Sequence, residues 1–133
     1  MTTLRTQRLV TVATALAFAT FDLVQKATAG ASLQHARSAS TLVLMGVVLL
    51  VLVVLVPRIR WTPVAVGAGI AAGGTLGNLV SLLVWSGGVP DPLVVRDVAF
   101  NLADVFVFCG DALLLSAAVV YALRNHDRLR LPV

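Results

Sequence analysis

Four long apolar runs account for most of this chain of 133 residues. They extend over about residues 9–28, 41–57, 62–85 and 99–123. A helix needs about 20 apolar residues to cross the hydrocarbon core of a bilayer, with about 17 as the lower limit. Backbone polar groups in lipid must bond to one another, which a helix achieves within a single segment. The runs therefore predict an all-α integral membrane protein with four transmembrane helices in a single domain, residues 1–133.

The composition excludes an ordinary soluble globule. Apolar residues make up 59% of the chain and charged residues 12%, whereas a soluble domain is about 25% charged. A small soluble domain leaves much of its surface exposed and has no place for so much apolar side chain. Little sequence remains outside the four runs, so the outer loops are predicted to be short.

Basic residues flank the apolar runs and predict the direction of the chain. Cytoplasmic loops of membrane proteins carry an excess of Lys and Arg. Both termini are predicted to be cytoplasmic, because seven arginines then lie inside, namely Arg5, Arg8, Arg58, Arg60, Arg124, Arg128 and Arg130. The outer loops hold only Arg37 and Arg96, and Lys26 lies near the outer end of the first run. This pattern accounts for the net charge of +4 without a nucleic-acid partner, and none is expected.

A cleavable signal peptide is an alternative interpretation of the first run. Arg5 and Arg8 precede a short apolar stretch, and residues 27–29 are similar to a small-residue cleavage site. Asp22 and Lys26 lie between the apolar stretch and that site, where a signal peptide has no use for them. A first helix that spans the membrane is therefore the preferred interpretation.

Ionisable side chains inside the runs are the main candidates for function, because they are costly in a membrane. Asp22 and Lys26 are four residues apart and share a helix face, so an ion pair between them is expected. The pair either locks the outer end of the first helix or contacts a substrate. Asn101, Asp104 and Asp111 lie on one stripe of the fourth helix. Asp111 lies near mid-membrane and is expected to be protonated or paired, with a structural or a proton-handling role.

Two further features lie around the third run. Its five glycines lead to Asn78, and small residues allow close helix packing while an Asn bonds across the contact. In the outer segment that follows, Asp91 sits between two prolines, which restrict the backbone and can aim its side chain. Asp97 lies in the same segment. These residues predict a polar site at the outer ends of the helices.

Four segments, taken in order, resemble the signal peptidase II family. Residues 22–26 (DLVQK) are similar to its D-Q-x-x-K segment, and residues 73–78 (GGTLGN) to its G-G-x-x-G-N segment. Residues 88–91 (GVPD) fall where the family has G-x-V-V-D-F. Residues 100–104 (FNLAD), followed by Gly110, match its F-N-x-A-D…G segment and are the most specific of the four.

The resemblance implies a membrane-embedded aspartic endopeptidase of the bacterial inner membrane. Such an enzyme removes the signal peptide from a diacylglyceryl-modified prolipoprotein, so prolipoproteins and membrane lipid are the implied partners. The catalytic acids would be Asp91 and Asp104, with Asp97 as an alternative to Asp91. The residues that would support the acids or bind substrate are Asp22, Lys26, Asn78 and Asn101. No cofactor is implied, and no metal is expected because His35 and His126 lie in loops on opposite sides of the membrane.

The chain departs from the family pattern at several places, and two other functions stay open. Ser81 and Leu82 stand where the family has an Asp-Arg pair, residues 34–40 lack its N-x-G-x-x-F pattern, and Pro92 replaces the Phe that follows the first acid. A non-catalytic relative that binds lipoproteins or another membrane partner is one alternative. A small proton-coupled transporter that loads protons on Asp22 and Asp111 is the other.

Overall fold

The computed structural model describes residues 2–30, 33–36 and 38–126, and it contains the four predicted helical spans. Three spans are single helices: α1 (Leu4–Ala29), α3 (Thr62–Val84) and α4 (Leu102–Arg124). The second combines α2 (Ala39–Leu50), the π-helix η1 (Val51–Leu55) and the 3₁₀ helix η2 (Val56–Ile59). Each span is long and apolar enough to cross a membrane. The predicted fold class is therefore confirmed.

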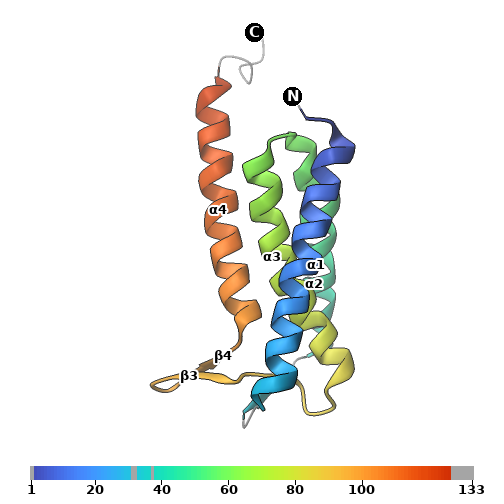
Figure 1. The fold of residues 1–133 in the computed structure, drawn as a ribbon, viewed down its shortest axis with the longest axis vertical. Coiled ribbons are helices and arrows are strands. Elements are labelled where there is room, and N and C mark those ends of the chain that lie inside the picture. The colour runs from blue at the N-terminus through green and yellow to red at the C-terminus, as the bar shows by residue number, and fades with distance from the viewer. Residues whose placement is uncertain (1, 31–32, 37, 127–133) are drawn as a thin grey trace.

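The helices lie alongside one another, and α1 begins at the end of the bundle where α4 ends (Figure 1). This arrangement is the one that an even number of membrane crossings requires. Arg37, Arg128 and Arg130, which contribute to the predicted orientation, lie outside the described residues. Among the described arginines, Arg60 and Arg124 line one cavity at the shared end. Which side of the membrane this end faces stays a prediction.

Helix α3 is the centre of the bundle. In its apolar window 61% of the residues are buried, against at most 28% in the other spans. Its glycines make this possible, because a Cβ on Gly69 would lie 2.9 Å from the Thr11 carbonyl oxygen of α1. A Cβ on Gly74 would lie 2.9 Å from the Val107 backbone nitrogen of α4. Both neighbouring helices therefore approach α3 at backbone distance, as small-residue packing in membranes predicts.

Two small antiparallel ladders join the outer segments. Strand β1 (Gln34–His35) pairs with β2 (Val89–Pro90), and β3 (Leu93–Val95) pairs with β4 (Val98–Phe100). They lie at the end of the bundle opposite to the start of α1 (Figure 1). The β1–β2 ladder brings the segment after α1 against the segment after α3. The outer loops are short, and their backbone groups are partly satisfied by each other.

The start of the fourth helix differs from the prediction. The apolar run begins at about residue 99, yet α4 begins at Leu102, because Val98–Phe100 form strand β4. Asn101 is the N-cap of the helix. Asp104 therefore lies in the first turn of α4, closer to the helix start than an apolar run from residue 99 implies. This shift places the carboxylate of Asp104 at the end of the bundle that carries the outer ladders.

Candidate active site

The first turn of α4 fixes Asp104 through a capping box. The Asn101 Oδ1 accepts from the Asp104 backbone N–H at 3.2 Å, and Asp104 Oδ2 accepts from the Asn101 backbone N–H at 3.3 Å. Two N–H groups that the helix cannot satisfy are bonded in this way. Asn101 is completely buried. Both side chains are consequently held by the local geometry of the helix start.

The same asparagine reaches the second acid. Asn101 Nδ2 donates to Asp91 Oδ1 at 2.6 Å, and Asp91 is buried, with 2% of its surface exposed. The Asp91 backbone N–H donates to the Leu33 carbonyl at 3.0 Å, which ties this residue to the segment after α1. Asn101 is thus bonded to both Asp91 and Asp104.

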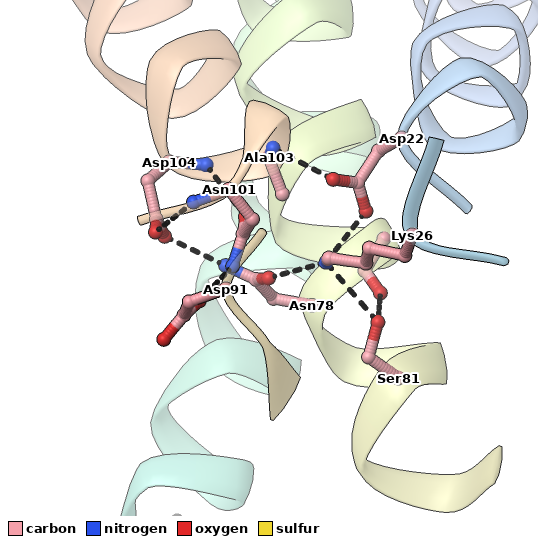
Figure 2. Close-up of polar contacts among 9 residues, drawn as sticks. Asp22, Lys26, Asn78, Ser81, Asp91, Asn101, Ala103 and Asp104 are labelled. Atoms are coloured by element: carbon pink, nitrogen blue, oxygen red, sulfur yellow. Dashed lines mark hydrogen bonds and ion pairs between the residues drawn. The ribbon is translucent and has the colours of Figure 1, made fainter. Parts of the chain in front are cut away.

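Asp91 and Asp104 line a common cavity. Its volume is about 530 Å³, and its other lining residues are His35, Ala36, Ser38, Thr41 and Ala99. Figure 2 shows the two acids together on one side of the polar network, with the Asp22–Lys26 pair on the other side. The arrangement presents two carboxyl groups to a space that a peptide bond and a water molecule can occupy.

A buried ion pair holds the helices behind the two acids. Lys26 Nζ donates to Asp22 Oδ2 at 2.7 Å, to Asn78 Oδ1 at 2.8 Å and to Ser81 Oγ at 3.1 Å. These three bonds use all the donor capacity of an ammonium group. The side chains of Asp22 and Lys26 are both fully inaccessible. The ion pair predicted from their spacing is therefore formed, and it links α1 to α3.

The network continues from the ion pair to α4. Asp22 Oδ1 accepts from the Ala103 backbone N–H at 2.8 Å, and Asn78 Nδ2 donates to Asp104 Oδ1 at 2.9 Å. Gly77 makes room for this, since a Cβ there would collide with the Asp22 carboxylate. Four of the predicted site residues, Asp22, Lys26, Asn78 and Asp104, therefore form one chain of hydrogen bonds across three helices (Figure 2).

Two acids named from the sequence lie outside this network. Asp97 is exposed in the turn between β3 and β4, and within the described ranges it makes no hydrogen bond. Asp111 lines a larger cavity of about 680 Å³ between α2 and α4, which also reaches Asn78 and Asp104. Within the described residues the Asp111 side chain makes no hydrogen bond or ion pair, so of the two predicted states, protonated or paired, the paired one is not found there.

Two residues of the site were not assigned from the sequence. His35 Nδ1 contacts Asp91 Oδ2, and Ser81 accepts from Lys26 and donates to the Gly77 carbonyl at 2.7 Å. Ser81 follows Asn78 by three residues and thus shares its helix face, so helical spacing could have identified it. The sequence contains no comparable spacing that would identify His35. Its place beside Asp91 depends on strand β1, which is only two residues long.

Side chains that commonly bind metal ions do not cluster in the part of the chain that the structure describes. No group of three His, Cys or Asp side chains there lies close enough together to hold a metal ion.

Comparison with known proteins gives one match. A family model described as signal peptidase (SPase) II matches residues 2–120. The matched range contains both cavity acids and every member of the polar network. No curated protein and no solved structure matches the chain significantly.

Proposed function

Because the chain belongs to the signal peptidase II family of aspartic peptidases, which process lipoprotein signal peptides, we propose that it is itself an active endopeptidase. Its substrates would be diacylglyceryl-modified prolipoproteins of the bacterial inner membrane. Asp91 and Asp104 would be its catalytic residues. The observation that carries the proposal is the cavity that these two acids line together, with Asn101 bonded to both.

Two carboxyl groups that face one cavity would supply both functions that peptide hydrolysis needs. Like charges at close range disfavour each other, so one group keeps a proton while the other is ionised. The ionised group takes a proton from water, whose oxygen bonds to the scissile carbonyl carbon. The protonated group donates to the carbonyl oxygen, where negative charge develops. When the C–N bond breaks, a proton passes to the departing amine nitrogen, and two peptides remain.

Asp91 is a better partner for Asp104 than Asp97 is. Asp91 shares both the cavity and Asn101 with Asp104, whereas Asp97 lies in an exposed hairpin turn. In the described part of the chain, Asp97 neither lines this cavity nor bonds to Asn101.

The cavity between α2 and α4 fits a substrate that remains in the membrane. It touches Asn78 and Asp104, and its remaining wall is mainly apolar, including Leu44, Val48, Val107 and Leu115. Apolar segments and acyl chains can lie against such a wall without losing contact with lipid. The bond to be cut would then be presented to Asp104 from the membrane side.

The test is cleavage of a lipidated prolipoprotein by the purified protein. Asp91→Asn and Asp104→Asn should each abolish cleavage, because an amide neither accepts the proton from water nor supplies an acidic one. Asp97→Asn is the matched control and should retain the wild-type rate, since that residue is exposed. Cleavage that survives Asp104→Asn, or a loss that is as severe in Asp97→Asn, would refute the assignment.

The alternative functions predict different results in the same preparation. A non-catalytic relative would retain lipidated precursor during purification without cutting it. A proton-coupled transporter would show substrate-driven proton flux in vesicles. Asp22 bonds to Lys26 and to the Ala103 backbone N–H, so a transporter that uses this carboxylate would have to break those bonds in each cycle.

A further inference from the structure

His35 contacts the carboxyl group of Asp91 at the mouth of the cavity. Its Nδ1 lies against Asp91 Oδ2, while Asn101 Nδ2 donates to the other oxygen. We propose that His35 is a positioning residue, whose Nδ1–H holds Asp91 as the ionised, water-activating member of the pair. This inference rests on the proposed function and adds to it a division of roles between the two acids.

The backbone places the imidazole at this point. His35 pairs with Val89 in the β1–β2 ladder, two residues before Asp91. Gly88 adopts a φ of 112°, and a Cβ there would collide with the His35 carbonyl. The His35 side chain is 60% exposed, whereas that of Asp91 is 3% exposed. The ring is therefore open to solvent on one side while it contacts a buried acid on the other.

The two acids have different partners, and this difference assigns their roles. Asp104 accepts hydrogen bonds from the Asn78 side-chain amide and from the Asn101 backbone, both of which are neutral donors. Asp91 accepts from the Asn101 amide and contacts an imidazole, which can carry a full positive charge. Hydrogen bonds from a charged donor to a carboxylate are about twice as strong as neutral ones. Asp91 is therefore the acid that has a donor able to carry charge, which fits the water-activating role in the proposed pair.

Three substitutions at His35 test this role in the prolipoprotein assay. His35→Ala removes the donor, and kcat should fall about tenfold or more, the value of a hydrogen bond to a charged group. His35→Asn should restore most of the rate, because its Nδ2 takes the position of Nδ1. His35→Gln places its amide nearer the position of Nε2 and should restore less. His126→Ala, at the far end of the bundle, controls for loss of a histidine.

The outcomes separate this inference from the proposed function. An active wild type whose rate is unchanged in His35→Ala overturns the inference alone. Equal losses in His35→Ala and His35→Asn, with unchanged melting temperatures, also overturn the donor role. A wild type that cuts no prolipoprotein overturns the proposed function and this inference with it.

A separate observation lies at the opposite end of the bundle. A cavity of about 360 Å³ is enclosed by the start of α1, the turn before α3 and the end of α4. Its lining includes two arginines, two aromatic rings, a hydroxyl and an amide, namely Arg60, Arg124, Trp61, Tyr121, Thr62 and Asn125. We propose that it binds the phosphate of an anionic phospholipid headgroup.

The charge of this cavity is uncompensated. In the described part of the chain, neither Arg60 nor Arg124 makes an ion pair or a side-chain hydrogen bond. Arg60 also adopts a left-handed φ of 57°, which costs energy in a residue other than glycine. Two guanidinium groups on one cavity favour a phosphate, which each can bind through parallel N–H donors.

Further donors and the aromatic rings agree with a headgroup. Thr62 Oγ1 accepts from Gln7 Nε2 at 3.3 Å, so its own hydrogen is free to donate into the cavity. The rings of Trp61 and Tyr121 lie 5.9 Å apart, and such residues mark the headgroup level of a bilayer. Basic pockets between transmembrane helices are known to hold lipid headgroups.

The test is lipid binding by the purified protein in detergent, measured by native mass spectrometry with phosphatidylglycerol and phosphatidylcholine. The wild type should prefer phosphatidylglycerol, and the double variant R60Q/R124Q should bind it at least about tenfold more weakly. The control R5Q/R8Q removes the same charge near the same end and should bind normally. Equal losses in both variants, or no preference between the lipids, would overturn the site. Glycerol phosphate that competes as well as the intact lipid would show a soluble phosphate to be the ligand and would also overturn it.

Discussion

Lys26→Met is the most informative substitution in the polar network. Methionine has nearly the shape of the lysine stem but no ammonium group, so packing is retained while three hydrogen bonds are lost. The Asp22 carboxylate then keeps a single donor, the Ala103 backbone N–H. A buried charge is left without a counter-ion, and this should destabilise the association of α1 with α3.

The expected loss follows from the burial of the pair. Both side chains are 0% exposed, so water does not screen their interaction. Removing one partner of a buried pair typically costs about 3–5 kcal/mol. The double variant Asp22→Asn/Lys26→Met removes both charges of this pair, and its amide can still accept from the Ala103 backbone N–H. We therefore expect the double variant to be more stable than Lys26→Met alone. A double-mutant cycle measures this coupling by comparing the double variant with the two single variants.

Unfolding in mixed micelles of increasing SDS content measures these free energies, with the fluorescence of Trp61 and Trp85 as the signal. Arg58→Met is the matched control, because it removes one exposed basic side chain and should change the free energy of unfolding by less than about 0.5 kcal/mol. A loss below about 1 kcal/mol in Lys26→Met would show that the ion pair is not buried as described.

Three further substitutions have defined outcomes. Gly74→Ala should cost about 1–3 kcal/mol of stability in the same micelle titration and slow prolipoprotein cleavage, because a Cβ would push α4 away from α3. Its control, Gly46→Ala, meets nothing within 4 Å and should be neutral or slightly stabilising. Asn101→Ala should cost about 1 kcal/mol as a lost helix cap and also abolish most cleavage, which the rate of product formation would show. Asp111→Leu should favour membrane insertion of α4 by up to about 3 kcal/mol in a translocon assay; a decrease would show that Asp111 has a partner.

Features that depend on local sequence could be predicted. The four spans follow from apolar runs that are long enough to cross a bilayer, and the structure contains them. The Asp22–Lys26 pair follows from helical spacing, and the two side chains meet at 2.7 Å. The start of α4 was placed too early because Val98–Phe100 are apolar and continue the helix run without interruption. The capping box of Asn101 and Asp104, three residues apart, was the signal that marked the true start.

Features that depend on contacts between distant segments could not be predicted. Lys26 meets Asn78 and Ser81 across more than 50 residues of sequence, and their spacing carries no information about this contact. His35 reaches Asp91 through a ladder of two residue pairs, which is too short to show an alternating pattern. The resemblance to a family named the candidate acids, whereas the hydrogen-bond partners of those acids required coordinates.

The short outer loops do not by themselves argue against a working active site. Asp104 is held by the first turn of α4, and Asn101, which caps that turn, also holds Asp91. Among the described residues of the outer segments, the Leu33 carbonyl and His35 contact Asp91. Ser81 occupies one of the positions at which the chain departs from the family pattern, and it still bonds to Lys26. The position of Asp104 is therefore built into the first turn of α4, and Asn101 ties Asp91 to that turn, so this arrangement does not depend on a long outer loop.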